Sequence, residues 1–237
     1  MRSTFSPARL TLNCVRLLAM LLWAIPAAAH AGLPLVPERH GHRIYEYGIY
    51  RNGDEVGTHR LEVHRTGRLI KVHCESDINI SLLGFSLYRF LYNAREVWDD
   101  RGLLQLSVQV NDGGDRFQLE GRRIDGSFQW TVNDEDRFVR PLPVFPTNHW
   151  NPEVLNQEQV LNTLTGKLNA VKIQSLDTFE LGVSPHIVQA SAYRYSGDLQ
   201  LVSWYGDDGR WLGMRFKGED GSTIEYRCSN CDAGARS

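Results

Sequence analysis

The stretch RIYEYGIYRNGDEVGTHRLEVHRTGRLIKVHCE, residues 43–75, decides the fold of this chain. Apolar and polar residues alternate along it, and this period of two is typical of β-strands with one buried face. Asn52-Gly53 interrupts the alternation with a dipeptide that favours a two-residue hairpin turn. Gly57 stands where the apolar positions change parity, which predicts a β-bulge. The stretch therefore predicts an antiparallel meander.

The same alternation predicts which side chains share a face of this meander. Leu61 and Val63 are expected to point to the same side as Ile70, Val72 and Cys74 of the following strand. The opposite side is expected to be a solvated surface of mixed charge. Its members are Arg60, Glu62, His64, Lys71, His73 and Glu75.

Most of the remaining chain continues the strand pattern. Further strands are expected at 86–98, 104–110, 117–121, 128–132, 168–176, 186–195, 199–205, 210–216 and 223–228. Ten to twelve strands exceed what an open twisted sheet carries easily, so such a sheet tends to curl. The predicted fold class is mainly β: a curled antiparallel sheet, barrel or half-barrel, with one short helix.

The helix is expected after a proline-rich connection at residues 140–152. Asn151 is a suitable N-cap, Pro152 fits the first helical turn, and Gly166 stands beyond the end. An apolar stripe along this helix would consist of Val154, Leu161 and Leu164.

The amino-terminal residues have the composition of an export signal. Three arginines precede an apolar run at 17–25, and Ala29-His30-Ala31 is a small-x-small cleavage site. We expect 1–31 to be a cleaved signal peptide, 32–42 a flexible mature N-terminus, 43–228 a single β domain and 229–237 a flexible tail. The expected location is the periplasm, or outside the cell.

Charge and motifs exclude several classes of function. Cleavage would remove three basic residues and no acidic one, which takes the net charge from −2 to −5. Without a basic run, we expect no nucleic-acid partner. No second apolar stretch is long enough to form an integral membrane segment after cleavage. The chain has no nucleophile elbow, P-loop or dinucleotide fingerprint, and no cofactor or specific metal site is expected.

Three cysteines would remain after cleavage: Cys74, Cys228 and Cys231. In an oxidising compartment this odd number predicts one disulfide and one spare thiol. Cys228 pairs either with Cys231, which would staple the last strand, or with Cys74.

Two groups of residues are candidate ligand-binding residues. Glu96 shares a strand face with Trp98, and burial of that face would raise the pKa of the carboxyl group and suit a polar anchor. Exposure at a rim, or a partner from another strand, is the alternative. His149 and Trp150 directly precede the predicted helix, whose free N–H groups suit an anion. Alternatively, Trp150 is a hydrophobic staple and Asn148 or Asn151 a cap.

Short motifs occur in a fixed order across residues 43–228. They are Tyr45-x-Tyr47, Gly53-x-x-x-Gly57, Glu96-x-Trp98, Pro146-Thr147-x-x-Trp150, Leu164-Thr165-Gly166, Gly197 ahead of Trp204-Tyr205, and Asp220-Gly221. This arrangement resembles the exported bacterial family known as domain of unknown function 6134. The resemblance implies an exported, mainly β protein and supplies no catalytic residues. The expected architecture is also similar to the half-barrel carriers of lipoproteins and lipids, at the level of the fold.

Three functional hypotheses follow. The first is non-enzymatic binding or carriage of a lipid or other apolar or amphipathic small molecule in the concavity of the sheet, which requires a cavity larger than a side chain. Its anchors would be Glu96, Trp98, His149 and Trp150. The second is an interaction or assembly protein whose partner is an envelope protein. The third is a hydrolase with His149 as the base, although a non-enzymatic role is favoured.

Overall fold

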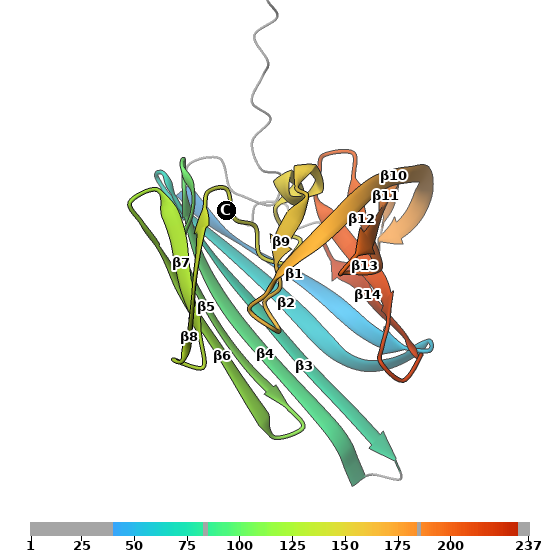
Figure 1. Ribbon diagram of the computed structural model, residues 1–237. Helices are drawn as coiled ribbons and strands as arrows, with labels where there is room; N and C mark the ends of the chain where they lie inside the picture. The colour runs from blue at the N-terminus through green and yellow to red at the C-terminus, as the bar shows by residue number, and fades with distance from the viewer. Residues whose placement is uncertain (1–39, 83–84, 184–185, 232–237) are drawn as a thin grey trace, which may run out of the picture. The chain divides into compact units, whose positions relative to one another are not determined.

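Fourteen antiparallel strands form one sheet in the computed structural model, which describes residues 40–82, 85–183 and 186–231 (Figure 1). The elements of this part of the chain are β1 (His40–Arg51), β2 (Asp54–Thr66), β3 (Leu69–Leu82), β4 (Phe85–Asp99), β5 (Gly102–Asp112), β6 (Asp115–Ile124), β7 (Ser127–Val132), β8 (Asp136–Pro141), the 3-10 helix η1 (Pro152–Asn156), β9 (Gln159–Leu161), β10 (Leu168–Val183), β11 (His186–Gly197), β12 (Leu201–Gly206), β13 (Trp211–Lys217) and β14 (Thr223–Asn230).

The sheet consists of two meanders that meet at β1 and β14. One meander runs from β1 outward to β8, and the other runs from β14 outward to β9 (Figure 1). At the junction, Tyr47 lies opposite Cys228 and Ile49 lies opposite Tyr226. Because β8 and β9 lie at the two ends of the strand order, the sheet is open. The predicted mainly β, antiparallel fold is therefore confirmed, in its open form.

The first hairpin forms as its turn residues predict. Asn52 and Gly53 have φ angles of 52° and 98°, the positive values that this type of turn requires. A bulge follows, because Ile49 lies opposite Gly57 while Tyr50 lies opposite Glu55. A Cβ atom on Gly57 would stand 2.1 Å from the carbonyl oxygen of Asp77, so the close approach of β3 requires glycine there.

Alternation divides the sheet into a buried face and an exposed face. Leu61 lies opposite Cys74 and Val63 opposite Val72, and all four side chains are buried as predicted. The core cluster collects residues of this kind from both meanders, including Tyr45, Tyr47, Ile49, Leu106, Val108, Trp130, Trp204 and Trp211. The mixed-charge residues of β2 and β3 lie on the opposite face, also as predicted.

The predicted helix after the proline-rich connection is mostly absent. Asn151 is the N-cap, and its side chain accepts a hydrogen bond from the backbone N–H of Glu153, but the helix is only the short η1. Leu161 belongs instead to β9, and Leu164 is 48% exposed, so the expected apolar stripe does not exist. The backbone N–H groups of Thr147 and Leu161 bond back to carbonyls within this segment, which favours a folded connection over a helix.

The connection at residues 142–167 is attached to the interior face of the sheet at several points. Trp130 of β7 donates a hydrogen bond from its indole to the carbonyl of Gly166, at 2.8 Å. Gly166 has a φ of 69°, and a Cβ atom there would meet Val132 at 2.2 Å. At the other end, Tyr205 of β12 donates to the carbonyl of His149, at 3.0 Å. The connection therefore lies against strands of both meanders.

Several predictions concern the ends of the chain. The predicted signal peptide at 1–31 and most of the predicted flexible segment at 32–42 lie outside the described residues, but β1 already includes 40–42. Cys228 and Cys231 form a disulfide with Cα atoms 5.9 Å apart, while Cys74 is free and buried. Within the described ranges, no helix has the length and apolar character needed to cross a membrane.

Candidate functional site

The interior face of β4 carries a carboxylate that is surrounded by hydrogen-bond donors. Glu96 is 1% exposed, and its Oε2 accepts from the indole of Trp98 at 2.6 Å and from the indole of Trp150 at 2.8 Å. Its Oε1 accepts from the side-chain amide of Asn148. Strand alternation places Glu96 and Trp98 on the same face, and the connection brings Asn148 and Trp150 to them.

Two opposing effects act on the pKa of the Glu96 carboxyl group. Burial raises its pKa, while the hydrogen bonds from Asn148, Trp150 and Trp98 lower it, and burial is the larger effect. Both oxygens are already used by three donors that come from the protein itself. The structure thus places Glu96, Trp98 and Trp150 together, as partners of one another inside the core rather than along an open cavity.

A second chain of hydrogen bonds fixes the connection above β4. The hydroxyl of Tyr92 donates to Asn148 Oδ1 at 2.5 Å and lies 3.0 Å from Thr163 Oγ1. Thr163 in turn lies 3.1 Å from the hydroxyl of Thr147. Asn148 thereby links Tyr92 to Glu96, and of the two residues expected as a cap, Asn148 or Asn151, it is Asn151 that caps η1.

His149 is buried between aromatic rings. It is 4% exposed, stacks on Trp211 with ring centroids 6.2 Å apart, and meets Tyr195 edge-on at 5.5 Å. Its φ is 58°, an unusual backbone conformation that histidine adopts more readily than most residues. Burial lowers the pKa of His149 to about 4, so the ring is neutral near pH 7. Among the described residues, no side chain hydrogen-bonds to this ring.

His59 is an interior residue that the sequence reasoning missed. It is 6% exposed and its Nδ1 lies 2.8 Å from the hydroxyl of Ser76. Burial, with a smaller contribution from His149, lowers the pKa of His59 to about 3. Its Nε2, like Nδ1 of His149, is buried without a hydrogen-bond partner among the described residues. The alternation of the strand does predict its burial, since His59 has the same parity as Leu61 and Val63.

The interior leaves little space for a ligand. The cavity bordered by His59 and His149 has a volume of about 90 Å³, which corresponds to roughly three water molecules. Ligand pockets for drug-sized molecules usually measure about 300–1,000 Å³. Among the described residues, the cavity behind the connection is therefore smaller than the ligand-sized apolar space that the first hypothesis expects.

An open groove of about 1060 Å³ lies beside this cavity. It shares with the cavity the residues Thr147, His149, Leu164 and Met214. Seven apolar or aromatic residues line it: Leu164, Tyr195, Leu199, Leu201, Val202, Met214 and Phe216. Of the four predicted anchors, His149 alone lines this groove. The other residues came from β11 to β13, where alternation predicted burial but gave no sign of an opening.

In the described part of the chain, no group of three or more His, Cys, Asp or Glu residues is placed to hold a metal ion. The disulfide between Cys228 and Cys231 occupies both thiols of this pair.

Comparisons with known proteins identify the fold and the family. A crystal structure of a β-barrel-like protein of domain of unknown function DUF1849 from Brucella abortus is similar to this chain, with a TM-score of 0.58. The two are 10% identical, and the match covers 83% of this chain and 99% of the other, which shows a common fold alone. No curated protein matches the chain. The family described as domain of unknown function (DUF6134) matches residues 47–229. This chain is therefore a member of the DUF6134 family.

Proposed function

We propose that this protein binds an amphipathic small molecule, without catalysis, in the open groove between the connection and strands β11 to β13. The observation that carries the proposal is the apolar lining of a groove of about 1060 Å³ that remains open to solvent. A volume of this order accommodates a ligand of the size of a lipid chain.

Apolar side chains that stay in contact with water in a groove lose the free energy that their burial would contribute. Leu164 is 48% exposed although it lies next to the buried Thr163. Met214 and Phe216 on β13 are only half-buried, while their neighbours Leu212 and Trp211 are buried. An apolar ligand would remove this surface from water, at about 25 cal/mol per Å².

The charged residues of the groove suit the polar end of an amphipathic ligand. Arg194, Arg215 and Lys217 line it together with Asp198 and Glu219. Asp198 accepts a hydrogen bond from the backbone N–H of Ala170, and Lys217 donates to Thr223. Register places Arg194 and Arg215 on the face of the sheet away from Tyr195 and Phe216, so the polar end of the ligand would lie at the rim of the groove, beside Lys217 and Glu219.

The proposed place of action is the periplasm or the outside of the cell. The support comes from the positive residues, the apolar run and the small-x-small site within 1–31. The disulfide between Cys228 and Cys231 is compatible with an oxidising compartment. Amino-terminal sequencing of the protein after expression in a bacterium tests this directly: a new terminus at Gly32 supports export, and an intact Met1 contradicts it.

Fatty-acid binding tests the groove. A fluorescent fatty acid should bind the wild-type protein and be displaced by unlabelled dodecanoate, while Leu164→Arg should weaken binding about tenfold or more, since it places a charge on the apolar lining. Leu87→Arg is the matched control, because Leu87 is 66% exposed and lies outside the groove. Absence of binding by the wild type, or equal binding by the two variants, would refute the proposal.

A second candidate function, as an interaction protein, is favoured by the edge of β10. β9 pairs with β10 only at Leu168–Ala170. The rest of β10 therefore has one edge without a ladder partner among the described residues. Such an edge can accept a strand from an envelope protein. Cross-linking from a Lys172→Cys variant in intact cells tests this: a discrete heteromeric adduct supports the candidate, and an uncross-linked monomer contradicts it.

A further inference from the structure

The exposed face of the first meander gathers positive charge from four separate strands. Its cross-strand register forms two neighbouring rows. In one row His73 lies opposite Arg95 and Arg95 opposite Ser107, and the row ends with Thr131 opposite Arg137. In the next row His64 lies opposite Lys71, and Gln105 lies opposite Arg122. Lys71, Arg95, Arg122 and Arg137 thus face the same side from β3, β4, β6 and β8.

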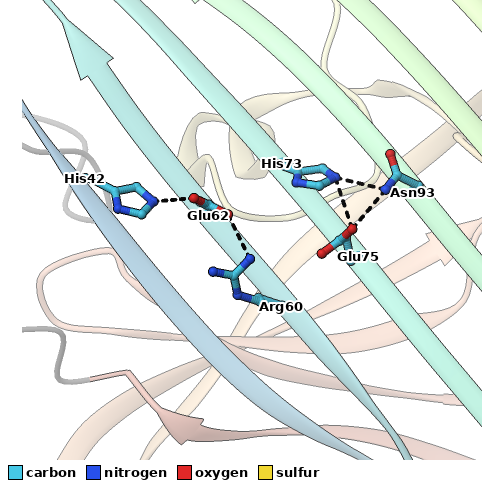
Figure 2. A network of polar contacts seen from close by, with 6 residues as sticks. All are labelled: His42, Arg60, Glu62, His73, Glu75 and Asn93. Carbon is cyan, nitrogen blue, oxygen red and sulfur yellow. Dashed lines mark hydrogen bonds and ion pairs between the residues drawn. The ribbon is translucent and has the colours of Figure 1, made fainter.

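The acidic residues of this face are already engaged. Figure 2 shows Glu62 in contact with His42 and with Arg60, the latter at 2.8 Å. The same view shows Glu75 accepting from Asn93 at 3.1 Å, with His73 nearby. Glu120 accepts from the hydroxyl of Ser107 at 2.7 Å.

The four cations, in contrast, have no such partners. Lys71, Arg95, Arg122 and Arg137 are exposed and form no ion pair with any side chain that the structure describes. A protein with a net charge of −2 therefore presents a locally cationic surface. The sequence did not show it because no two of these residues are close together along the chain.

The same face is hollowed. An open trough of about 1020 Å³ is lined by all four cations, by two carboxylates, Glu62 and Glu120, and by uncharged polar residues that lie between the cations. These polar residues are Gln105, Ser107, Gln129 and Thr131. With strands about 4.8 Å apart, the trough crosses from β3 to β8 over roughly 24 Å along the sheet. Cations therefore alternate with amides and hydroxyls along an extended path.

We propose that this trough binds an acidic oligosaccharide. Arginine and lysine recognise carboxylate, sulfate or phosphate groups, while amides and hydroxyls exchange hydrogen bonds with sugar hydroxyls. An added peptide strand finds no free backbone edge from β3 to β7, because each of these strands is paired on both sides within the sheet. Single-stranded nucleic acid fits poorly, because the aromatic residue of the trough, Trp130, is buried and turned to the core.

Titration calorimetry with a galacturonic acid hexamer tests the proposal. The wild-type protein should bind the hexamer at low ionic strength, bind it more weakly as salt is added, and not bind the fully methyl-esterified hexamer. Arg95→Gln/Arg122→Gln should weaken binding roughly tenfold or more, and Lys71→Gln/Arg137→Gln should do the same.

The control is Arg101→Gln/Arg140→Gln, which removes two exposed cations outside the trough and should bind like the wild type. Circular dichroism confirms that each variant is folded. No binding by the wild type, equal loss in the control, or equal binding of the methyl ester would overturn the proposal. Equal affinity for poly-glutamate would also overturn it, since the trough would then recognise charge without the sugar.

Discussion

The two buried histidines should make this fold sensitive to acid. Burial lowers the pKa of His59 to about 3 and that of His149 to about 4, whereas a histidine in the unfolded chain titrates near 6.5. The unfolded state therefore binds more protons than the native state below pH 6.5. It follows that the free energy of unfolding decreases as the pH falls through this range.

The magnitude depends little on the native pKa values, provided that both lie below 5. Below the unfolded pKa the loss for each histidine approaches 1.36 kcal/mol per pH unit, so between pH 7.5 and pH 5 each removes about 2 kcal/mol, and the pair about 4 kcal/mol. A typical domain is stable by about 5–15 kcal/mol, so this is a large fraction. Glu96 acts in the opposite direction, because its raised pKa favours the protonated native state as the pH falls.

Urea unfolding at pH 7.5 and pH 5, followed by tryptophan fluorescence, measures the effect. His149→Asn keeps a residue that tolerates the positive φ, and it should reduce the loss of stability between the two pH values by about 2 kcal/mol. The contribution of Glu96 is common to both proteins and cancels in the comparison. His64→Asn, which replaces an exposed histidine of the outer face, is the control. If His149→Asn lost as much stability as the wild type, His149 would not be buried in its neutral form.

Three further predictions concern the core. Glu96→Gln should cost about 1–3 kcal/mol in urea unfolding, because its amide NH2 would face another donor, either the indoles of Trp98 and Trp150 or the side-chain amide of Asn148; an unchanged midpoint would contradict the hydrogen-bonded cluster. Gly57→Ala should lower stability by about 1–3 kcal/mol, since its Cβ would meet the Asp77 carbonyl, whereas Gly182→Ala, which has open space, should have little effect; equal melting temperatures would refute this. The thiol of Cys74, whose pKa burial raises well above the usual value, should resist iodoacetamide until urea unfolds the protein, and rapid labelling of the native state at Cys74 would show that it is accessible.

Local patterns predicted the sheet well, since they depend on neighbouring residues. The parity of Leu61 and Val63 gave the buried face, and Asn52-Gly53 gave the first turn. The pairing of β1 with β14 could not be predicted, because alternation specifies which face a residue occupies but not which distant strand lies beside it.

The sequence indicated Glu96, Trp98 and Trp150 as candidate residues but not the contacts between them. Glu96, Trp98 and Trp150 do come together, but as mutual partners, and only the tertiary contacts of the connection reveal this. The helix expected from Asn151 and Pro152 ends early because tertiary pairing takes Leu161 into β9. His59 was overlooked because a histidine on a strand resembles the exposed histidines of the outer face.

The junction of β1 with β14 has a consequence for how the chain is made. β1 is the first strand of the described residues, and one of its two neighbours, β14, lies at the far end of the sequence, so one edge of β1 stays bare until synthesis is almost finished. A ribosome-bound chain that has already assembled β1 to β8 would therefore expose unpaired backbone N–H and C=O groups along β1, the strand that later lies inside the complete sheet. Chains that stop before Thr223 lose that last neighbour, and two such chains can pair through β1 instead, so premature termination would yield aggregates rather than a smaller folded protein.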